Sequence, residues 1–107
     1  MKTLWPIECS ESPSSIQAWA KSTFGDESLR SLAAKLFEES SELLWELDHQ
    51  DLGSATEELA DVLIVLARLP GRFPALGRTI DRKMQRNRER KWARQPDGTM
   101  HHEGGES

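Results

Sequence analysis

Acidic side chains at helical spacing are the residues of this sequence whose types and positions suit a functional site. They form two clusters set among leucines, "EESSE" at residues 38–42 and "EELAD" at residues 57–61. Burying an isolated carboxylate costs several kcal/mol, so a helix rarely turns acids toward a core unless positive charge meets them there. The clusters therefore predict a site that binds cations.

Helical periodicity directs acids of both clusters toward the core. A helix turns about 100° per residue, and on this basis Glu39 lies about 60° from the centre of a leucine stripe, with Glu42 just beyond its edge. In the second cluster Glu58 lies inside the apolar arc, and Asp61 follows one turn later. We expect two facing helices to bring these four carboxylates together.

An all-oxygen donor set of this kind suits the hard cations Mg²⁺ or Mn²⁺. A di-iron helical bundle would need Glu-x-x-His pairs, and His49, His101 and His102 do not have that spacing. The remaining alternative is that the acids are solvated helix faces, as such runs often are. Spacing alone leaves both interpretations open.

Helix signals run through most of the chain, and no segment shows the sustained alternation of a strand. Ser12 before Pro13 indicates one helix start, and "SATE" at 54–57 has the form of a capping box in which Glu57 reaches back. The expected helices span about residues 13–23, 26–49, 54–69 and 74–94. We expect an all-α single domain over 1–107, a compact four-helix bundle with a flexible polar tail at 95–107.

Charge is divided unevenly along the chain. Residues 1–71 carry 5 basic and 13 acidic groups, whereas residues 72–94 carry 9 basic and 2 acidic groups. This asymmetry favours a metal-bound polyphosphate or, through the basic fourth helix, a nucleic acid; the acidic first part argues against the nucleic acid. The single cysteine, Cys9, and the absence of a long apolar run indicate a cytoplasmic protein that is not in a membrane.

The ordered pair "KLFEESSELLWEL" and "EELADVLIVLARL" resembles the MazG-like nucleoside triphosphate pyrophosphohydrolases, an all-α superfamily with E-E-x-x-E and then E-x-x-D on successive helices. "IQAWAKSTFG" is similar to the family's first helix and "KMQRNRERKW" to the basic last helix of compact members. The resemblance therefore spans about residues 14 to 94.

This resemblance implies a role for each acid. Glu39, Glu42, Glu58 and Asp61 match the metal ligands, and Glu38 matches the glutamate that assists the attacking water. The implied reaction is Mg²⁺-dependent cleavage of a nucleoside triphosphate between the α and β phosphates, with Mn²⁺ able to substitute. The alternatives within the superfamily are dUTP and phosphoribosyl-ATP. Pairing into a homodimer or homotetramer is also implied, because compact members are similar to half of a larger bundle.

Further residues are candidates for substrate binding. Lys83, Asn87 and Arg90 share one face of the expected fourth helix, where they could hold the polyphosphate, or could be solvated. Lys35, one turn before Glu39, is either a phosphate contact or a salt-bridge partner of that glutamate. Trp19 is the candidate aromatic platform for the base, with core packing as the alternative.

Overall fold

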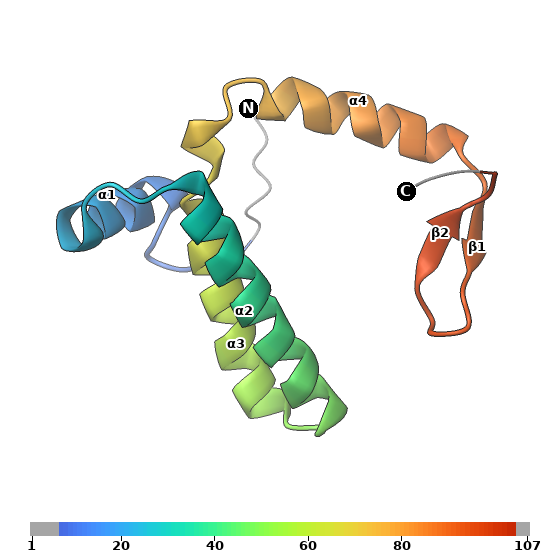
Figure 1. Cartoon of the computed structure of the whole chain (residues 1–107), viewed down its shortest axis with the longest axis horizontal. Coiled ribbons are helices and arrows are strands. Elements are labelled where there is room, and N and C mark those ends of the chain that lie inside the picture. Colours follow the sequence, from blue (N-terminus) through green and yellow to red (C-terminus); the bar gives the residue numbers. More distant parts are fainter. Residues whose placement is uncertain (1–6, 105–107) are drawn as a thin grey trace. The chain divides into compact units, whose positions relative to one another are not determined.

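The computed structural model describes residues 7–104, which are mostly helical (Figure 1). The elements in chain order are α1 (Pro13–Phe24), α2 (Leu29–Asp48), α3 (Leu52–Ala67), a short 3-10 helix η1 (Pro70–Arg72), α4 (Leu76–Glu89), β1 (Trp92–Arg94) and β2 (Met100–His102). The predicted helical class is confirmed, with a small β-hairpin added at the end.

The described residues form two compact units, residues 7–73 and residues 74–104. The first contains α1, α2, α3 and η1, and the second contains α4 and the two strands. That all 107 residues act as one domain, and that oligomerisation completes the core, remain predictions.

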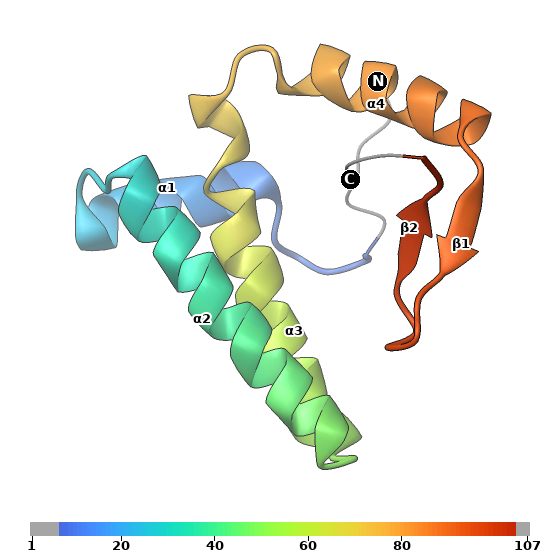
Figure 2. The same cartoon turned by 45° about the vertical axis from the view of Figure 1, so that its right-hand side comes forward.

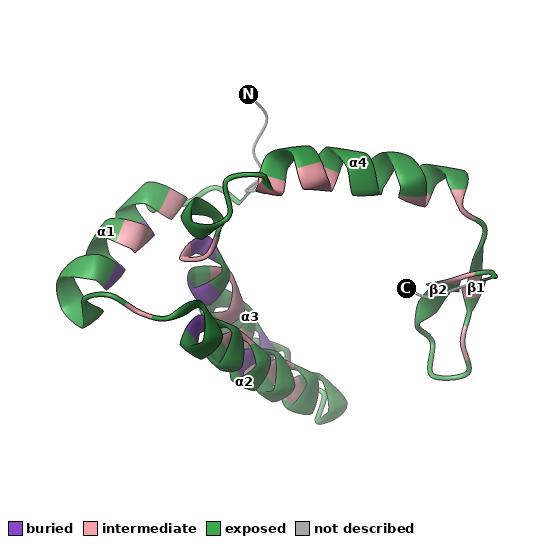
Figure 3. Cartoon of the chain, turned by 45° about the horizontal axis from the view of Figure 1, so that its top comes forward, coloured by how far each residue is buried: buried purple, intermediate pink, exposed green. Residues whose placement is uncertain are grey.

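The first unit is built on an antiparallel pair of long helices, α2 and α3, which lie side by side along their length (Figure 2). Its core is small, as expected for a chain of this size. Among the described residues, the buried apolar ones are Ile16, Ala20, Leu32, Ala55, Val65 and Ala67. Figure 3 marks buried positions on α1, α2 and α3. Helix α1 is tied to α3 by Gln17, whose Nε2 donates a hydrogen bond to the carbonyl of Ala67 over 2.8 Å.

The first two helices begin at serine caps. The side chain of Ser12 accepts a hydrogen bond from the backbone N–H of Ser15, and Pro13 follows it, as the sequence predicts. Helix α2 starts at Leu29, slightly later than predicted, because the side chain of Ser28 accepts from the N–H of Ser31 and fixes the boundary there. Side-chain caps therefore decide where both helices begin.

The predicted start of the third helix is wrong. Helix α3 begins at Leu52 and is capped by Asp51, whose carboxylate accepts hydrogen bonds from the N–H of Ser54 (3.0 Å) and from its hydroxyl (2.9 Å). Ser54 is thus the third residue of the helix, and Glu57 is not its cap. These hydrogen bonds hold the pKa of Asp51 below its usual range, so the cap carries a full negative charge at the positive end of the helix.

The predicted extent of the fourth helix is also wrong, because α4 ends at Glu89 and the backbone of Arg90 is extended. Strands β1 and β2 then pair antiparallel, with Trp92 opposite His102. Asp97 organises the turn, since its Oδ1 accepts from the N–H (3.0 Å) and the hydroxyl (2.6 Å) of Thr99. Residues 100–102 of the tail expected to be flexible are therefore a strand, and residues 105–107 lie outside the described range.

Replacing the cap of α3 tests this boundary. We expect Asp51→Ala to lower the melting temperature by a few degrees, because the N–H of Ser54 loses its acceptor and the helix dipole loses its counter-charge. Glu57→Ala is the matched control and should leave the melting temperature nearly unchanged. The reverse ranking in thermal denaturation would restore the capping box predicted from the sequence.

Candidate metal centre

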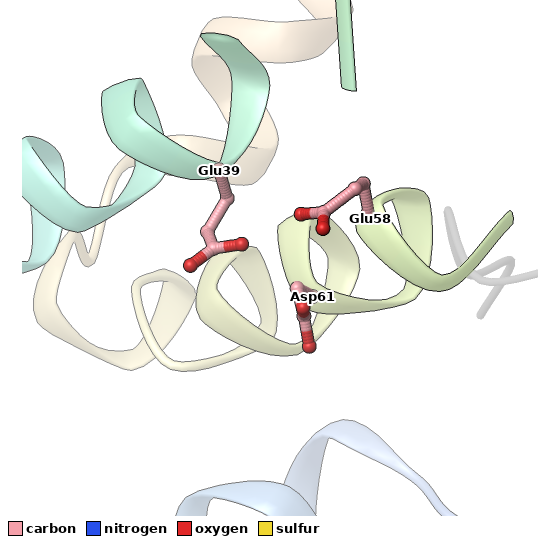
Figure 4. Close-up of side chains that lie close together, drawn as sticks. All are labelled: Glu39, Glu58 and Asp61. Carbon is pink, nitrogen blue, oxygen red and sulfur yellow. The ribbon is translucent and has the colours of Figure 1, made fainter. Parts of the chain in front are cut away.

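Three of the four predicted ligand acids converge between the two long helices (Figure 4). Glu39 comes from α2, and Glu58 and Asp61 come from α3. One carboxylate oxygen of each lies within 4.8 Å of one oxygen of each of the others. Helical spacing therefore identified acids that the structure brings together.

Two of these carboxylates are withdrawn from water. Glu39 is only 6% exposed, Glu58 is half-buried and Asp61 is exposed. The Oε2 atoms of Glu39 and Glu58 are buried and have no hydrogen-bond partner. Since a buried acceptor without a partner is costly, these two oxygens fit a cation that enters from the open side, where Asp61 lies.

Lys35 meets part of this negative charge. Its Nζ lies 3.0 Å from Oε1 of Glu39 and 3.6 Å from Oε2 of Glu38. The hydrogen bond from Lys35 holds the pKa of Glu39 below its usual range and raises the pKa of the lysine. Of the two roles predicted for Lys35, the salt bridge to Glu39 is the one that the structure contains.

Glu58 experiences the opposite environment. Hydrogen bonding with the carboxyl group of Glu42, followed by desolvation and the charges of Glu42 and Glu39, raises the pKa of Glu58 to about 7. Glu42 is not one of the three acids within 4.8 Å of one another, but it is the largest influence on the pKa of Glu58. Like charges this close cannot all ionise cheaply without a cation. An all-oxygen anionic set with an open side fits Mg²⁺ or Mn²⁺.

Glu38 and Trp19 lie outside the acid cluster. The side chain of Glu38 is 57% exposed on α2, beside Lys35. Trp19 is half-exposed on α1, packs edge-on against Phe24 and lines an apolar cavity of about 570 Å³ together with Ala60 and Ile64 of α3. Trp19 thus lines a cavity. The sequence could not show this, because the cavity depends on how α1 packs against α3.

Lys83, Asn87 and Arg90 belong to the second unit. Lys83 is exposed, Asn87 is half-buried, and Arg90 is the residue that caps the end of α4. The carbonyl of Asn87 accepts a hydrogen bond from Nε1 of Trp92 (2.9 Å), which fastens the β-hairpin to the end of the helix. That these three side chains contact phosphates remains a prediction.

Paired helices with clustered carboxylates are an arrangement that helical metal-binding proteins use. The family model of the MazG nucleotide pyrophosphohydrolase domain matches residues 27–73. The match contains all five acids of the predicted site and Lys35, and it excludes α1 and α4.

The resemblance to MazG-like proteins is confirmed over these residues, which are just under half of the chain. At the level of the family it indicates a hydrolase that acts on nucleotides. No curated protein and no solved structure matches the chain. Among residues 7–104, no helix combines the length and the apolar character that a membrane crossing requires.

The raised pKa of Glu58 predicts how the metal-free protein responds to pH. A carboxyl group whose pKa is higher in the folded than in the unfolded state stabilises the fold fully below the unfolded value of 4.5 and loses this contribution as pH rises through about 7. In EDTA, the urea concentration at the midpoint of unfolding should therefore decrease as the pH is raised from 5 to 8.

Glu58→Gln should flatten this pH dependence, because glutamine does not titrate. Glu57→Gln, one position away on α3, is the control and should keep the wild-type profile. A profile that is equally steep in wild type and in Glu58→Gln would show that Glu58 is not the group responsible.

Proposed function

We propose that this protein is a Mg²⁺-dependent nucleoside triphosphate pyrophosphohydrolase, which cleaves its substrate between the α and β phosphates to give a nucleoside monophosphate and pyrophosphate. The observation that carries this proposal is the convergence of Glu39, Glu58 and Asp61 with two buried oxygens that lack partners. The family match over residues 27–73 supports it. The nucleotide substrate and the unpaired Cys9 favour a cytoplasmic location.

The proposed role of each acid, metal ligand or proton acceptor, follows from its position. Glu39 and Glu42 from α2, and Glu58 and Asp61 from α3, would hold Mg²⁺ or Mn²⁺ between the two helices. Bound divalent ions would supply positive charge to the phosphate oxygens and acidify a water molecule. Glu38, beside the cluster and open to solvent, would accept the proton of the attacking water.

Groups outside the acid cluster would hold the two ends of the nucleotide. The cavity lined by Trp19 offers an apolar, aromatic wall to a base. Lys83, Asn87 and Arg90 would bind the phosphates through charge and N–H donors. A preference for dUTP or phosphoribosyl-ATP would use the same acids and would differ at the cavity.

Exposed apolar side chains support assembly into a dimer or tetramer. Phe37 is 77% exposed, Leu44 61% and Trp45 56%, all on α2, and Leu52 at the start of α3 is 74% exposed. Large exposed apolar side chains of this kind are costly for a monomer, and a second copy of the chain would cover them.

Hydrolysis products test the proposed reaction. The protein should be incubated with a panel of nucleoside triphosphates and Mg²⁺ or Mn²⁺, and monophosphate, pyrophosphate and orthophosphate followed separately. We expect equal amounts of monophosphate and pyrophosphate, and no turnover in EDTA. Orthophosphate as the first product would contradict cleavage between the α and β phosphates.

The same assay tests the ligands. Glu58→Gln and Asp61→Asn should each lower kcat/KM by at least about a hundredfold, since each removes charge from the metal site at little cost in volume. Glu57→Gln is the matched control and should retain activity. Circular dichroism should show the same helical content in all variants. Full turnover in either of the first two would remove that residue from the site.

The oligomeric state is tested by light scattering on the purified protein. We expect at least twice the chain mass of 12.1 kDa, because the exposed face of α2 favours self-association. Phe37→Ser should shift the mass toward the monomer, because it removes an exposed apolar side chain from α2. Ser40 is also exposed on this helix, next to the acids, but it is polar and adds nothing to the apolar face. A monomer at micromolar concentration would refute self-association.

A further inference from the structure

A second hollow lies at the other end of the α2–α3 pair, away from the loop that joins these helices. It has a volume of about 360 Å³ and is bounded by α1, the α1–α2 connection, the start of α2 and the end of α3. Its charged lining residues are three cations and two acids: Lys21, Arg68, Arg72, Asp26 and Glu27. Cations are therefore in excess around this cavity, in a unit whose overall charge is negative.

Arg68 is the fixed point of this cavity. Its side chain is only 10% exposed, its Nη2 forms an ion pair with Oε1 of Glu27, and its guanidinium lies 5.2 Å from the ring centroid of Phe24. These contacts hold the planar group in one orientation. Its Nε is nevertheless buried and has no hydrogen-bond partner.

Arg72 is also held in place. Its Nη1 donates to the carbonyl of Glu27 over 2.8 Å, which leaves further N–H groups of the guanidinium for a ligand. Lys21 adds an ammonium group from α1, and Gly25, with a positive φ of 72°, turns the chain back beside it. The cavity thus offers N–H donors from three cations and one buried N–H that requires an acceptor.

We propose that this cavity, which we call the cationic pocket, binds pyrophosphate, the leaving group of the proposed reaction. A phosphate oxygen would accept from Nε of Arg68, which the fold leaves without a partner. Lys21 and Arg72 would neutralise the remaining charge, arginine by paired N–H donors and lysine as a point charge. The ion pair with Glu27 stays in place, because it uses a different nitrogen of Arg68.

The pocket lies on the same side of the helix pair as the acids. Arg68 follows Asp61, and Leu32 precedes Glu39, by one heptad, so each pair lies on nearly the same helix face. Two helical turns correspond to about 10 Å along the axis. A pyrophosphate group cut free at the acids would therefore reach the pocket by a short shift along the helices. The role of the pocket as an acceptor of cleaved pyrophosphate rests on the proposed function, whereas its ability to bind an anion does not.

Calorimetric titration with sodium pyrophosphate in EDTA tests the pocket without metal and without turnover. We expect Lys21→Gln and Arg72→Gln each to weaken binding by about tenfold or more, the usual loss for one charge-assisted hydrogen bond. Asp26→Asn should strengthen binding, because it removes a negative charge from the rim. Arg30→Gln removes a cation that does not line the pocket and is the matched control.

Three results would overturn the proposal: no binding of pyrophosphate to the wild-type protein, equal affinity in Lys21→Gln, Arg72→Gln and Arg30→Gln, or loss of binding only in Lys83→Gln. Arg68→Gln is a poorer probe, since it also breaks the ion pair with Glu27. Failure here is distinct from failure of the proposed function. Nucleotide cleavage with no pyrophosphate binding would reject the pocket alone, and pyrophosphate binding with no cleavage would reject the enzyme alone.

Discussion

Repulsion between carboxylates is the constraint on which this structure depends. Packing of α2 against α3 brings three acids within 4.8 Å of one another, so the free energy of helix packing must exceed the cost of collecting like charges. The small core contributes to this packing, since Ala55, Val65 and Ala67 on α3 are buried. The ion pair between Lys35 and Glu39 offsets part of this repulsion, and the raised pKa of Glu58 lowers the negative charge of the cluster. A bound cation would offset the rest.

The sequence predicted the acid cluster well because helical periodicity is a property of the backbone alone. Glu39 is buried and Glu58 half-buried, as their positions on the two apolar stripes indicated. Helix ends were harder to predict, since neighbouring polar residues compete to cap the same turn. At the start of α3, Asp51 and Ser54 both had suitable side chains, and the charged one became the cap.

Features that depend on particular side-chain contacts could not be predicted from helical periodicity. The β-hairpin relies on Asp97 and Thr99 in the turn and on Trp92 bonding to Asn87, whereas the basic sequence before it continues a helical pattern. The cationic pocket brings together Lys21 and Arg68, which lie far apart in the chain. The phosphate contacts predicted from the sequence were Lys35 beside the acids and residues of the basic fourth helix, and an isolated arginine at the end of an apolar helix gave no such signal.

Helix α1 separates two hollows of different character. Trp19 faces the apolar one and Lys21 the cationic one, while the hydrogen bond from Gln17 to Ala67 holds the helix between them. None of these three residues belongs to the acid cluster or to the segment that matches the MazG family model. A substitution on α1 can therefore alter both hollows and leave the acid cluster unchanged, although residues of the matched segment also line each hollow.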